Sequence, residues 1–95
     1  MALPIVFTNT FSEELEIAVT YLSENWSNTV KVDFLVALAE KIERIETMPE
    51  MYPVSLKNLG IHRCLVNNRI ALYYRIKEDR VEMLSIRSTR RDDTL

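Results

Sequence analysis

Hydrophobic and polar positions follow a helical period through the first half of the chain and a strand period through the last third. A short apolar run at residues 5–8, entered through Pro4, predicts a first strand. Apolar residues then recur every three or four positions, which predicts one amphipathic helix. Its stripe consists of Phe11, Leu15, Ala18, Val19, Leu22 and Trp26. The run Thr10-Phe11-Ser12-Glu13 has the form of a capping box, so the helix should begin there.

A second amphipathic helix is predicted over residues 29–47. Its stripe consists of Val32, Leu35, Leu38, Ala39, Ile42 and Ile45. Two such helices joined by a few residues form a helix hairpin, and each needs a further apolar surface to cover its stripe. The following connector, residues 48–60, holds Pro49, Pro53 and Gly60, which argues against regular structure there.

Three strands are predicted in the last third, at residues 61–66, 69–76 and 81–86. In the middle strand Ile70, Leu72, Tyr74 and Ile76 share one face, while Arg69, Ala71, Tyr73 and Arg75 share the other. We expect one face to pack on the helices and the other to be partly open to water. The pair Asn67-Asn68 suits a two-residue hairpin turn, because Asn tolerates positive φ.

The predicted architecture is therefore α+β, with element order β-α-α-β-β-β and a helix hairpin on a mainly antiparallel sheet. In an alternative, the first strand is too weak to pair. The 95 residues fit a single domain, 1–95. No apolar run approaches the roughly 20 residues of a membrane span, and the N-terminus lacks signal-peptide features. A single cysteine, Cys64, fits a buried position in a reducing compartment, so a cytoplasmic protein is expected.

Charge divides the chain into two unlike halves. Residues 1–50 hold three basic and nine acidic residues, a net charge of −6. Residues 51–95 hold nine basic and five acidic residues, a net charge of +4. This asymmetry suggests that the basic half faces an anionic partner, either nucleic acid or an acidic peptide.

Several kinds of chemistry lack the residues they need. His62 is the only histidine, so neither a metal cluster nor a serine hydrolase triad is supported, and one glycine cannot build a phosphate-binding loop. No metal or cofactor is expected. Arginines and tyrosines remain, because guanidinium groups bind phosphate and aromatic rings stack on unpaired bases.

The candidate site residues come from this arginine and tyrosine set. Arg63, Arg90 and Arg91 are the candidates for catalysis. The candidates for contact with RNA or a partner are Lys57, Tyr74, Arg75 and Arg87. In the alternative interpretation, arginines on exposed strand faces serve solubility and discourage edge pairing, which we favour for Arg69, Arg75 and Arg80.

Three features occur in a fixed order: the helix pair after a short strand, residues 61–66 leading to residues 71–76, and the tail at residues 81–92. In these features the chain resembles the RelE/ParE superfamily of bacterial type II toxins. The resemblance implies a toxin that a cognate antitoxin neutralises, and that either cleaves messenger RNA on the ribosome or inhibits DNA gyrase. In the RelE-like pattern Arg63 and either Arg90 or Arg91 would orient the scissile phosphate.

The sequence departs from the RelE-like pattern at Ser88, where many relatives carry a histidine or another acid/base group. Serine is a poor acid or base near neutral pH, which argues against efficient cleavage. His62 should face away from Arg63 because adjacent strand residues alternate. Two alternatives stay open: a non-catalytic module that holds an acidic peptide, and an inactive toxin relative. An exposed sheet edge or helix pair would also permit a homodimer.

Overall fold

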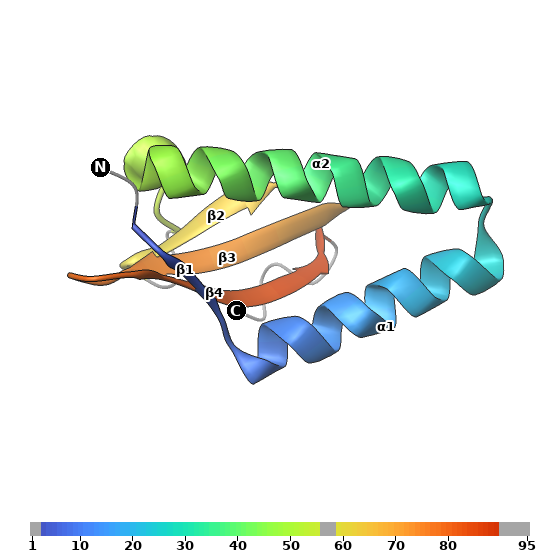
Figure 1. Cartoon of the computed structure of the whole chain (residues 1–95), viewed down its shortest axis with the longest axis horizontal. Helices are drawn as coiled ribbons and strands as arrows, with labels where there is room; N and C mark the ends of the chain where they lie inside the picture. Colours follow the sequence, from blue (N-terminus) through green and yellow to red (C-terminus); the bar gives the residue numbers. More distant parts are fainter. Residues whose placement is uncertain (1–2, 56–58, 90–95) are drawn as a thin grey trace.

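Two helices pack around a four-stranded sheet (Figure 1). The computed structural model describes residues 3–55 and 59–89. Its elements are β1 (Ile5–Phe7), α1 (Asn9–Asn25), α2 (Asn28–Thr47), the short 3-10 helix η1 (Pro49–Met51), β2 (Ile61–Leu65), β3 (Ile70–Ile76) and β4 (Val81–Ser88). The helices meet at the α1–α2 turn and diverge from it, with the sheet on the open side and α1 beside β4. Among the described residues no helix is both long and apolar enough to cross a membrane.

The strand order is β1-β4-β3-β2. β1 pairs with β4 in parallel, and the other two strand pairs are antiparallel. The predicted α+β class, element order and mainly antiparallel sheet are therefore confirmed. The alternative with an unpaired first strand is wrong, since residues 5–7 pair with residues 81–83.

Helix α1 begins at Asn9 after the N-cap Thr8, two residues before the start that the predicted capping box implies. The N-cap is Thr8, whose Oγ1 accepts from the Phe11 backbone N–H at 3.1 Å and donates to the Leu84 carbonyl at 3.0 Å. The predicted capping box at Thr10 is wrong, because Thr10 already lies inside the helix. Thr8 takes the capping role because it leaves β1 in an extended conformation beside β4.

The buried stripe of α2 differs from the predicted one. Phe34, Leu38 and Ile45 are buried, with at most 4% exposure, so the prediction is confirmed for Leu38 and Ile45. It is wrong for Val32 and Leu35, which are 43% and 38% exposed. Apolar residues lie on two faces of this helix, and the sequence pattern alone does not distinguish the face that meets the sheet.

The β2–β3 turn is held by a side chain rather than by positive φ. Asn67 Oδ1 accepts from the backbone N–H groups of Arg69 and Ile70, at 2.8 and 2.9 Å. Within the described chain no residue other than glycine has positive φ, so the predicted two-residue turn is wrong. Asn instead acts through its short side chain, which bonds to backbone two and three residues on.

The connector before β2 is more regular than predicted. It contains η1, and Val54 forms an isolated antiparallel bridge with His62. The Arg63 backbone N–H donates to the Pro53 carbonyl at 3.0 Å, and Ser55 N–H donates to the Ile61 carbonyl at 2.7 Å. The connector thus covers part of the β2 edge, which would otherwise leave backbone groups unpaired.

A β-bulge between β3 and β4 decides which residues of β4 face the core. Tyr73 pairs with Ser85 and Tyr74 with Met83, so Leu84 is the extra residue. The bulge lets Met83 and Ile86 both join the core although three positions separate them. The core unites both helices with β2, β3 and β4; its buried members are Phe11, Phe34, Leu38, Ile45, Cys64, Val66, Leu72, Tyr74, Val81, Met83 and Ile86.

Both faces of β3 are buried along its centre. Leu72 and Tyr74 belong to the core, as the alternation predicts. On the other face, however, Ala71 and Tyr73 are 0% and 1% exposed. The prediction that this second face is partly open to water is therefore wrong at these two positions, although Arg75 on the same face is exposed.

Candidate functional site

Polar side chains form a row across the face of the sheet opposite the core. Arg63 on β2 pairs in register with Tyr73 on β3, which pairs with Ser85 on β4. Side chains at paired positions lie on the same face of a sheet. Arg63 Nε donates to the Tyr73 hydroxyl at 3.4 Å. We call these three residues, with Glu14 and Arg87 described next, the polar row.

Glu14 of α1 completes the polar row at the β4 edge. Its Oε1 accepts from Ser85 Oγ at 2.6 Å and from the Ile86 backbone N–H at 3.2 Å. Its Oε2 lies 3.3 Å from Arg87 Nε, which also donates to Ser85 Oγ at 2.9 Å. Ser85 is 2% exposed, and a buried hydroxyl requires such partners. The Glu14 carboxylate thus accepts hydrogen bonds from the buried Ser85 hydroxyl and the Ile86 backbone N–H, and it also pairs with the Arg87 guanidinium.

Sequence reasoning did not identify Glu14 as a site residue. In the sequence it is one of three glutamates in the first turns of a helix, where the helix dipole favours negative charge. Its partner Ser85 is 71 positions away, so no local pattern connects the two. The sequence did contain one indication of this role. Glu14 lies between Phe11 and Leu15, two apolar residues on the side of the helix that packs on the core.

Arg87 was predicted to contact RNA or a partner, and the structure places it against α1. Its side chain is 27% exposed and pairs with Glu14, which is 26% exposed. Charge pairs at this depth are screened less than surface pairs. In this conformation the Arg87 guanidinium serves to hold α1 on β4.

Arg75 lies on the same face as Tyr73, two residues along β3. Its Nη2 is 3.5 Å from Glu82 Oε1, across the β3–β4 pair. Arg80 also contacts Glu82, at 3.3 Å, and contacts Asp79 at 2.8 Å. Two arginines thus share one carboxylate at the end of the sheet remote from the β2–β3 turn. Exposed pairs of this kind contribute little stability and leave Arg75 accessible.

Tyr74 was predicted to contact RNA or a partner, but in this structure it offers no accessible surface. Tyr74 is 0% exposed and belongs to the core. Its hydroxyl donates to the Pro49 carbonyl at 2.5 Å, and its ring stacks on His62 with centroids 5.0 Å apart. Burial raises the pKa of the Tyr74 phenol above its ordinary value. Strand alternation places Tyr74 opposite Tyr73, and the connector covers it.

His62 and Cys64 also lie on the core side of β2. His62 Nδ1 is 2.7 Å from the Tyr52 carbonyl, which can only accept, so Nδ1 carries the proton of this bond. The expectation that His62 faces away from Arg63 is confirmed. Cys64 is 1% exposed and burial raises the pKa of its thiol, which confirms its role as a buried apolar residue. The described parts of the chain contain no group of three metal-ligating side chains.

Three predicted site residues, Lys57, Arg90 and Arg91, lie outside the described residues. Ser88 is exposed at the end of β4. The structure therefore brings Arg63 and Arg87 into one row, leaves Arg75 farther along the sheet, and separates Tyr74 from all of them. The Glu14 carboxylate pairs with one of the two guanidinium groups of the row, that of Arg87, so the row is only partly neutralised and is not a bare cationic surface for phosphate.

The fold matches solved toxin structures over nearly the whole chain. The chromosomal ParDE TA system from P. aeruginosa aligns with a TM-score of 0.77 and 10% identity, covering 92% of this chain and 96% of that chain. The E. coli DinJ–YafQ toxin–antitoxin complex aligns at 0.64 and 8%, covering 93% of each. The YoeB dimer from Staphylococcus aureus aligns at 0.63 and 16%, covering 92% and 97%. At these identities the likeness is one of fold.

Sequence comparison with whole families is more specific. No curated protein sequence matches the chain. Residues 5–93, however, match the family described as the ParE toxin of the type II toxin–antitoxin system parDE. This match includes every element from β1 to β4 and the tail that follows. The chain belongs to the ParE toxin family, within the RelE/ParE superfamily that its sequence resembles.

Proposed function

We propose that this protein arrests bacterial growth as the toxin of a type II toxin–antitoxin pair, that a cognate antitoxin neutralises it, and that its target is DNA gyrase. The family match over residues 5–93 carries this proposal. Members of the superfamily with the ParE pattern inhibit gyrase, whereas RelE-like members cut messenger RNA. The proposal follows the family that the chain matches.

The polar row supports the same choice of target. A cleaving site needs a group near neutral pKa to activate the ribose hydroxyl, together with cations that remain available for the phosphate. Ser88 supplies no such group, and the core position of His62 keeps that imidazole away from Arg63. Arg87 is paired with Glu14. The described residues are thus better suited to protein contact than to phosphodiester cleavage.

A second candidate is ribosome-dependent cleavage of messenger RNA. The contact between Arg63 and Tyr73 favours it, since a guanidinium next to a phenol places a phosphate ligand beside an ionisable group. This candidate needs the Tyr73 hydroxyl, now buried, to become accessible on the ribosome. It also draws on Arg90 and Arg91, the other predicted catalytic arginines.

Induced expression in a bacterial host distinguishes these functions. Plasmid supercoiling, DNA breaks, amino-acid incorporation and messenger RNA length would be followed together after induction. We expect growth arrest with DNA breaks or altered supercoiling before amino-acid incorporation falls. Truncated messages that appear first would support the second candidate, and unarrested growth would contradict both and favour a non-catalytic binding module or an inactive relative.

The Arg63→Ala variant sharpens this experiment. If cleavage is the activity, alanine should abolish growth arrest because it removes the predicted phosphate ligand. If gyrase is the target through protein contact, the effect should be partial. Lys77→Ala is the matched control, since Lys77 is an exposed basic residue in the β3–β4 turn, away from the polar row. Circular dichroism would verify that each variant is folded.

A further inference from the structure

Two methionines are presented to solvent where α2 ends and η1 begins. Met48 is 60% exposed and Met51 is 52% exposed. Met83, by contrast, is fully buried in the core. Methionine is among the residues most often buried, so two exposed thioethers so close in the sequence are unusual. In Figure 1 this end of α2 lies opposite the α1–α2 turn.

The backbone directs both side chains to one side of the chain. Met48 closes α2, because its N–H donates to the Arg44 carbonyl at 2.8 Å. Met48 also begins η1, since the Met51 N–H donates to the Met48 carbonyl at 3.1 Å. Side chains three residues apart in a 3-10 turn lie one above the other. Pro49, at the start of η1, restricts the backbone of this turn.

Both side chains line one hollow of about 240 Å³. The rest of its lining comes from the last turns of α2: Glu43, Arg44 and Thr47. The Thr47 hydroxyl donates to the Glu43 carbonyl at 3.0 Å. The charges of Glu43 and Arg44 offset each other, while the C-terminus of a helix carries about half a negative charge. The hollow therefore offers two neutral sulfur donors at a slightly negative helix end.

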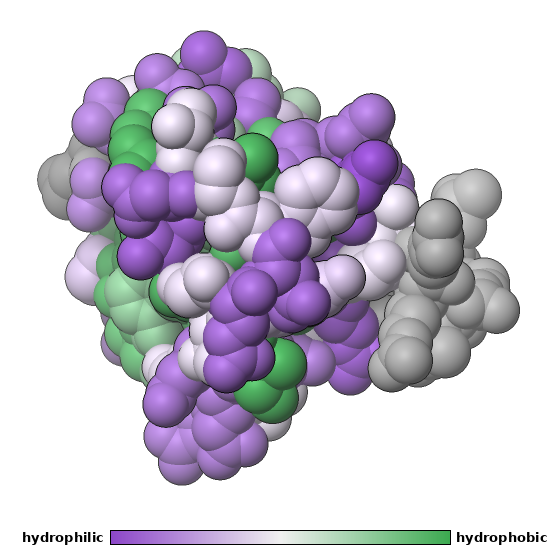
Figure 2. Space-filling view, turned by 90° about the vertical axis from the view of Figure 1, so that its right-hand side faces the viewer, coloured by the Kyte–Doolittle hydropathy of each residue, from purple (hydrophilic) through white to green (hydrophobic). Residues whose placement is uncertain are grey.

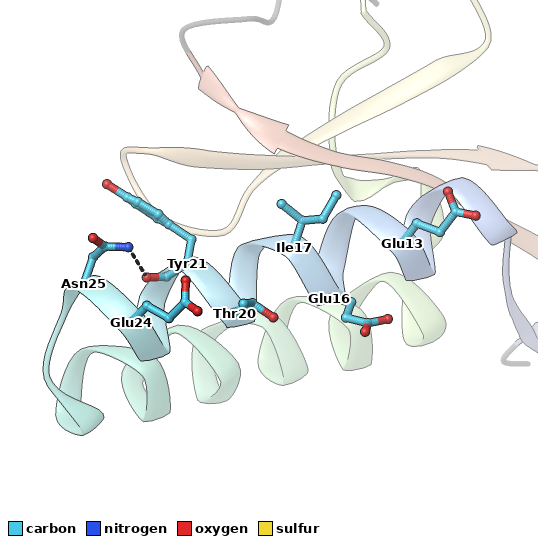
Figure 3. A pocket seen from close by; sticks show the side chains of 7 residues that line it. All are labelled: Glu13, Glu16, Ile17, Thr20, Tyr21, Glu24 and Asn25. Carbon is cyan, nitrogen blue, oxygen red and sulfur yellow. Dashed lines mark hydrogen bonds between the residues drawn. The ribbon is translucent and has the colours of Figure 1, made fainter.

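A larger hollow, of about 570 Å³, lies on α1 and has no sulfur in its lining. Figure 3 shows that its side chains end in carboxylate, hydroxyl, amide or hydrocarbon groups. Within the described chain no three His, Cys, Asp or Glu side chains are grouped to hold a metal ion. The end of the molecule at the α1–α2 turn shows a mainly hydrophilic surface with separate hydrophobic patches (Figure 2). Of the two hollows, the one at the end of α2 suits a soft ligand.

We propose that Met48 and Met51 bind the soft monovalent cation Cu(I) through their thioether sulfurs. Thioethers select Cu(I), whereas Mg²⁺ and Ca²⁺ require oxygen ligands. Cu(I) accepts low coordination numbers, so two sulfurs suffice where a zinc site needs a larger ligand set. The expectation of no metal, drawn from the lone histidine, did not consider thioether ligands. We call Met48 and Met51 the thioether pair.

An ion held by the thioether pair would fix η1. Pro49 lies between the two ligands, and its carbonyl accepts a hydrogen bond from the Tyr74 hydroxyl at 2.5 Å. A bound ion closes a ring across this turn and so limits movement of the connector that covers β2. Because Cu(I) would bind the folded chain preferentially, the urea midpoint of unfolding should rise with its concentration. The site goes beyond the proposed function, since neither methionine belongs to the polar row.

Nuclear magnetic resonance of protein labelled with ¹³C at the methionine methyl groups tests the site. Ag(I) would be titrated first, as a redox-stable substitute, and Cu(I) would follow without oxygen. We expect the methyl signals of Met48 and Met51 to shift together and to saturate near one ion per chain, with a dissociation constant roughly in the micromolar range. The Met83 signal should stay in place, and Zn²⁺ or Ca²⁺ should move none of these signals.

Leucine variants test each ligand. Met48→Leu and Met51→Leu should each weaken binding at least about tenfold, because leucine keeps the volume of the side chain but removes the sulfur. Glu50→Gln is the matched control, since Glu50 is exposed between the two methionines and both sulfurs remain. Binding to this control should stay within about twofold of wild type.

The buried thiol of Cys64 is the competing soft ligand, and pH distinguishes it from the thioether pair. Thioethers carry no proton, so their affinity for Ag(I) should be the same at pH 6 and pH 8. A thiol must lose its proton to bind a metal, so its affinity rises with pH. In Cys64→Ala the signals of Met48 and Met51 should still shift.

Four results would overturn the proposal. These are no shift of either exposed methyl signal with Ag(I) and Cu(I), a shift of only one, undiminished binding in both leucine variants, and an affinity that rises with pH. The first result would leave the thioether pair as an adaptable apolar surface for contact with another protein.

Discussion

At the scale of single residues, the charged groups of this protein do two different jobs. Glu14 bonds to Ser85, Ile86 and Arg87 on β4, and so acts inside the structure. Glu16, two positions later, is exposed on α1. Both glutamates belong to the same acidic run of the sequence. Their difference arises from helix geometry, because positions two apart point to different sides of a helix.

Replacing Glu14 should show how much the polar row contributes to stability. In Glu14→Ala the buried Ser85 hydroxyl and the Ile86 N–H lose their acceptor, which should cost about 2–3 kcal/mol. Glu14→Gln keeps an acceptor oxygen but loses the charge, so about 1 kcal/mol is expected. Urea denaturation measures both. Glu16→Ala, the control, should stay within about 0.5 kcal/mol of wild type, and a Glu14→Ala variant as stable as this control would contradict the role assigned to Glu14.

At the scale of elements, the start of α1 depends on the strand before it. Thr8 closes β1, caps the helix and bonds to β4 through one hydroxyl. Thr10, which the capping-box pattern singles out, makes no cap because the helix has already begun. The position of the helix terminus is thus set by strand pairing over 76 positions of sequence. Local pattern alone could not distinguish the two threonines.

The two threonines should respond differently to alanine. Thr8→Ala removes the acceptor for the Phe11 amide and the donor to the Leu84 carbonyl, so a loss of about 1–2 kcal/mol is expected. Thr10→Ala should be neutral within about 0.5 kcal/mol, since alanine is favourable inside a helix. Midpoints of urea unfolding give the comparison. A greater loss at Thr10 than at Thr8 would show that the helix begins where the sequence pattern places it.

Sequence patterns predicted the order and type of every main element, because helical and strand periods differ strongly here. These patterns failed where a contact between residues far apart in the sequence determines the local structure. The β-bulge moves Ser85 to the outer face and admits Ile86 to the core. The connector buries Tyr74 through Pro49, and Arg87 finds its partner in Glu14. No local pattern contains these contacts. Strand alternation did place Tyr74 on the same face as Leu72, but its burial there is not compatible with the predicted contact with RNA or a partner.

At the scale of the whole molecule, one core joins both helices to the sheet. Ionisable groups within that core connect global stability to pH. Cys64 and Tyr74 are both buried, and burial raises the pKa of each above its ordinary value, 9.0 for the thiol and 10.0 for the phenol. Folded protein keeps both groups neutral at a pH where the unfolded chain releases their protons. Alkali therefore favours the unfolded chain.

The free energy of unfolding should accordingly be insensitive to these two groups below about pH 8 and should fall increasingly steeply through pH 9. Each group contributes a slope of at most about 1.4 kcal/mol per pH unit, first Cys64 and then Tyr74 from near pH 10. Urea midpoints measured from pH 7 to 10.5 would show this decline. Cys64→Ala should remove the part that begins near pH 9, whatever its effect at neutral pH. Tyr74→Phe should reduce the part that begins near pH 10 without abolishing it, because burial raises the pKa of the Tyr52 phenol as well. Tyr21→Phe, which changes an exposed phenol, should keep the full decline. If the wild-type urea midpoint stays level to pH 10.5, these side chains ionise as readily in the folded protein as in the unfolded chain. The same conclusion follows if the midpoint of Cys64→Ala declines as steeply as that of the wild type between pH 9 and 10.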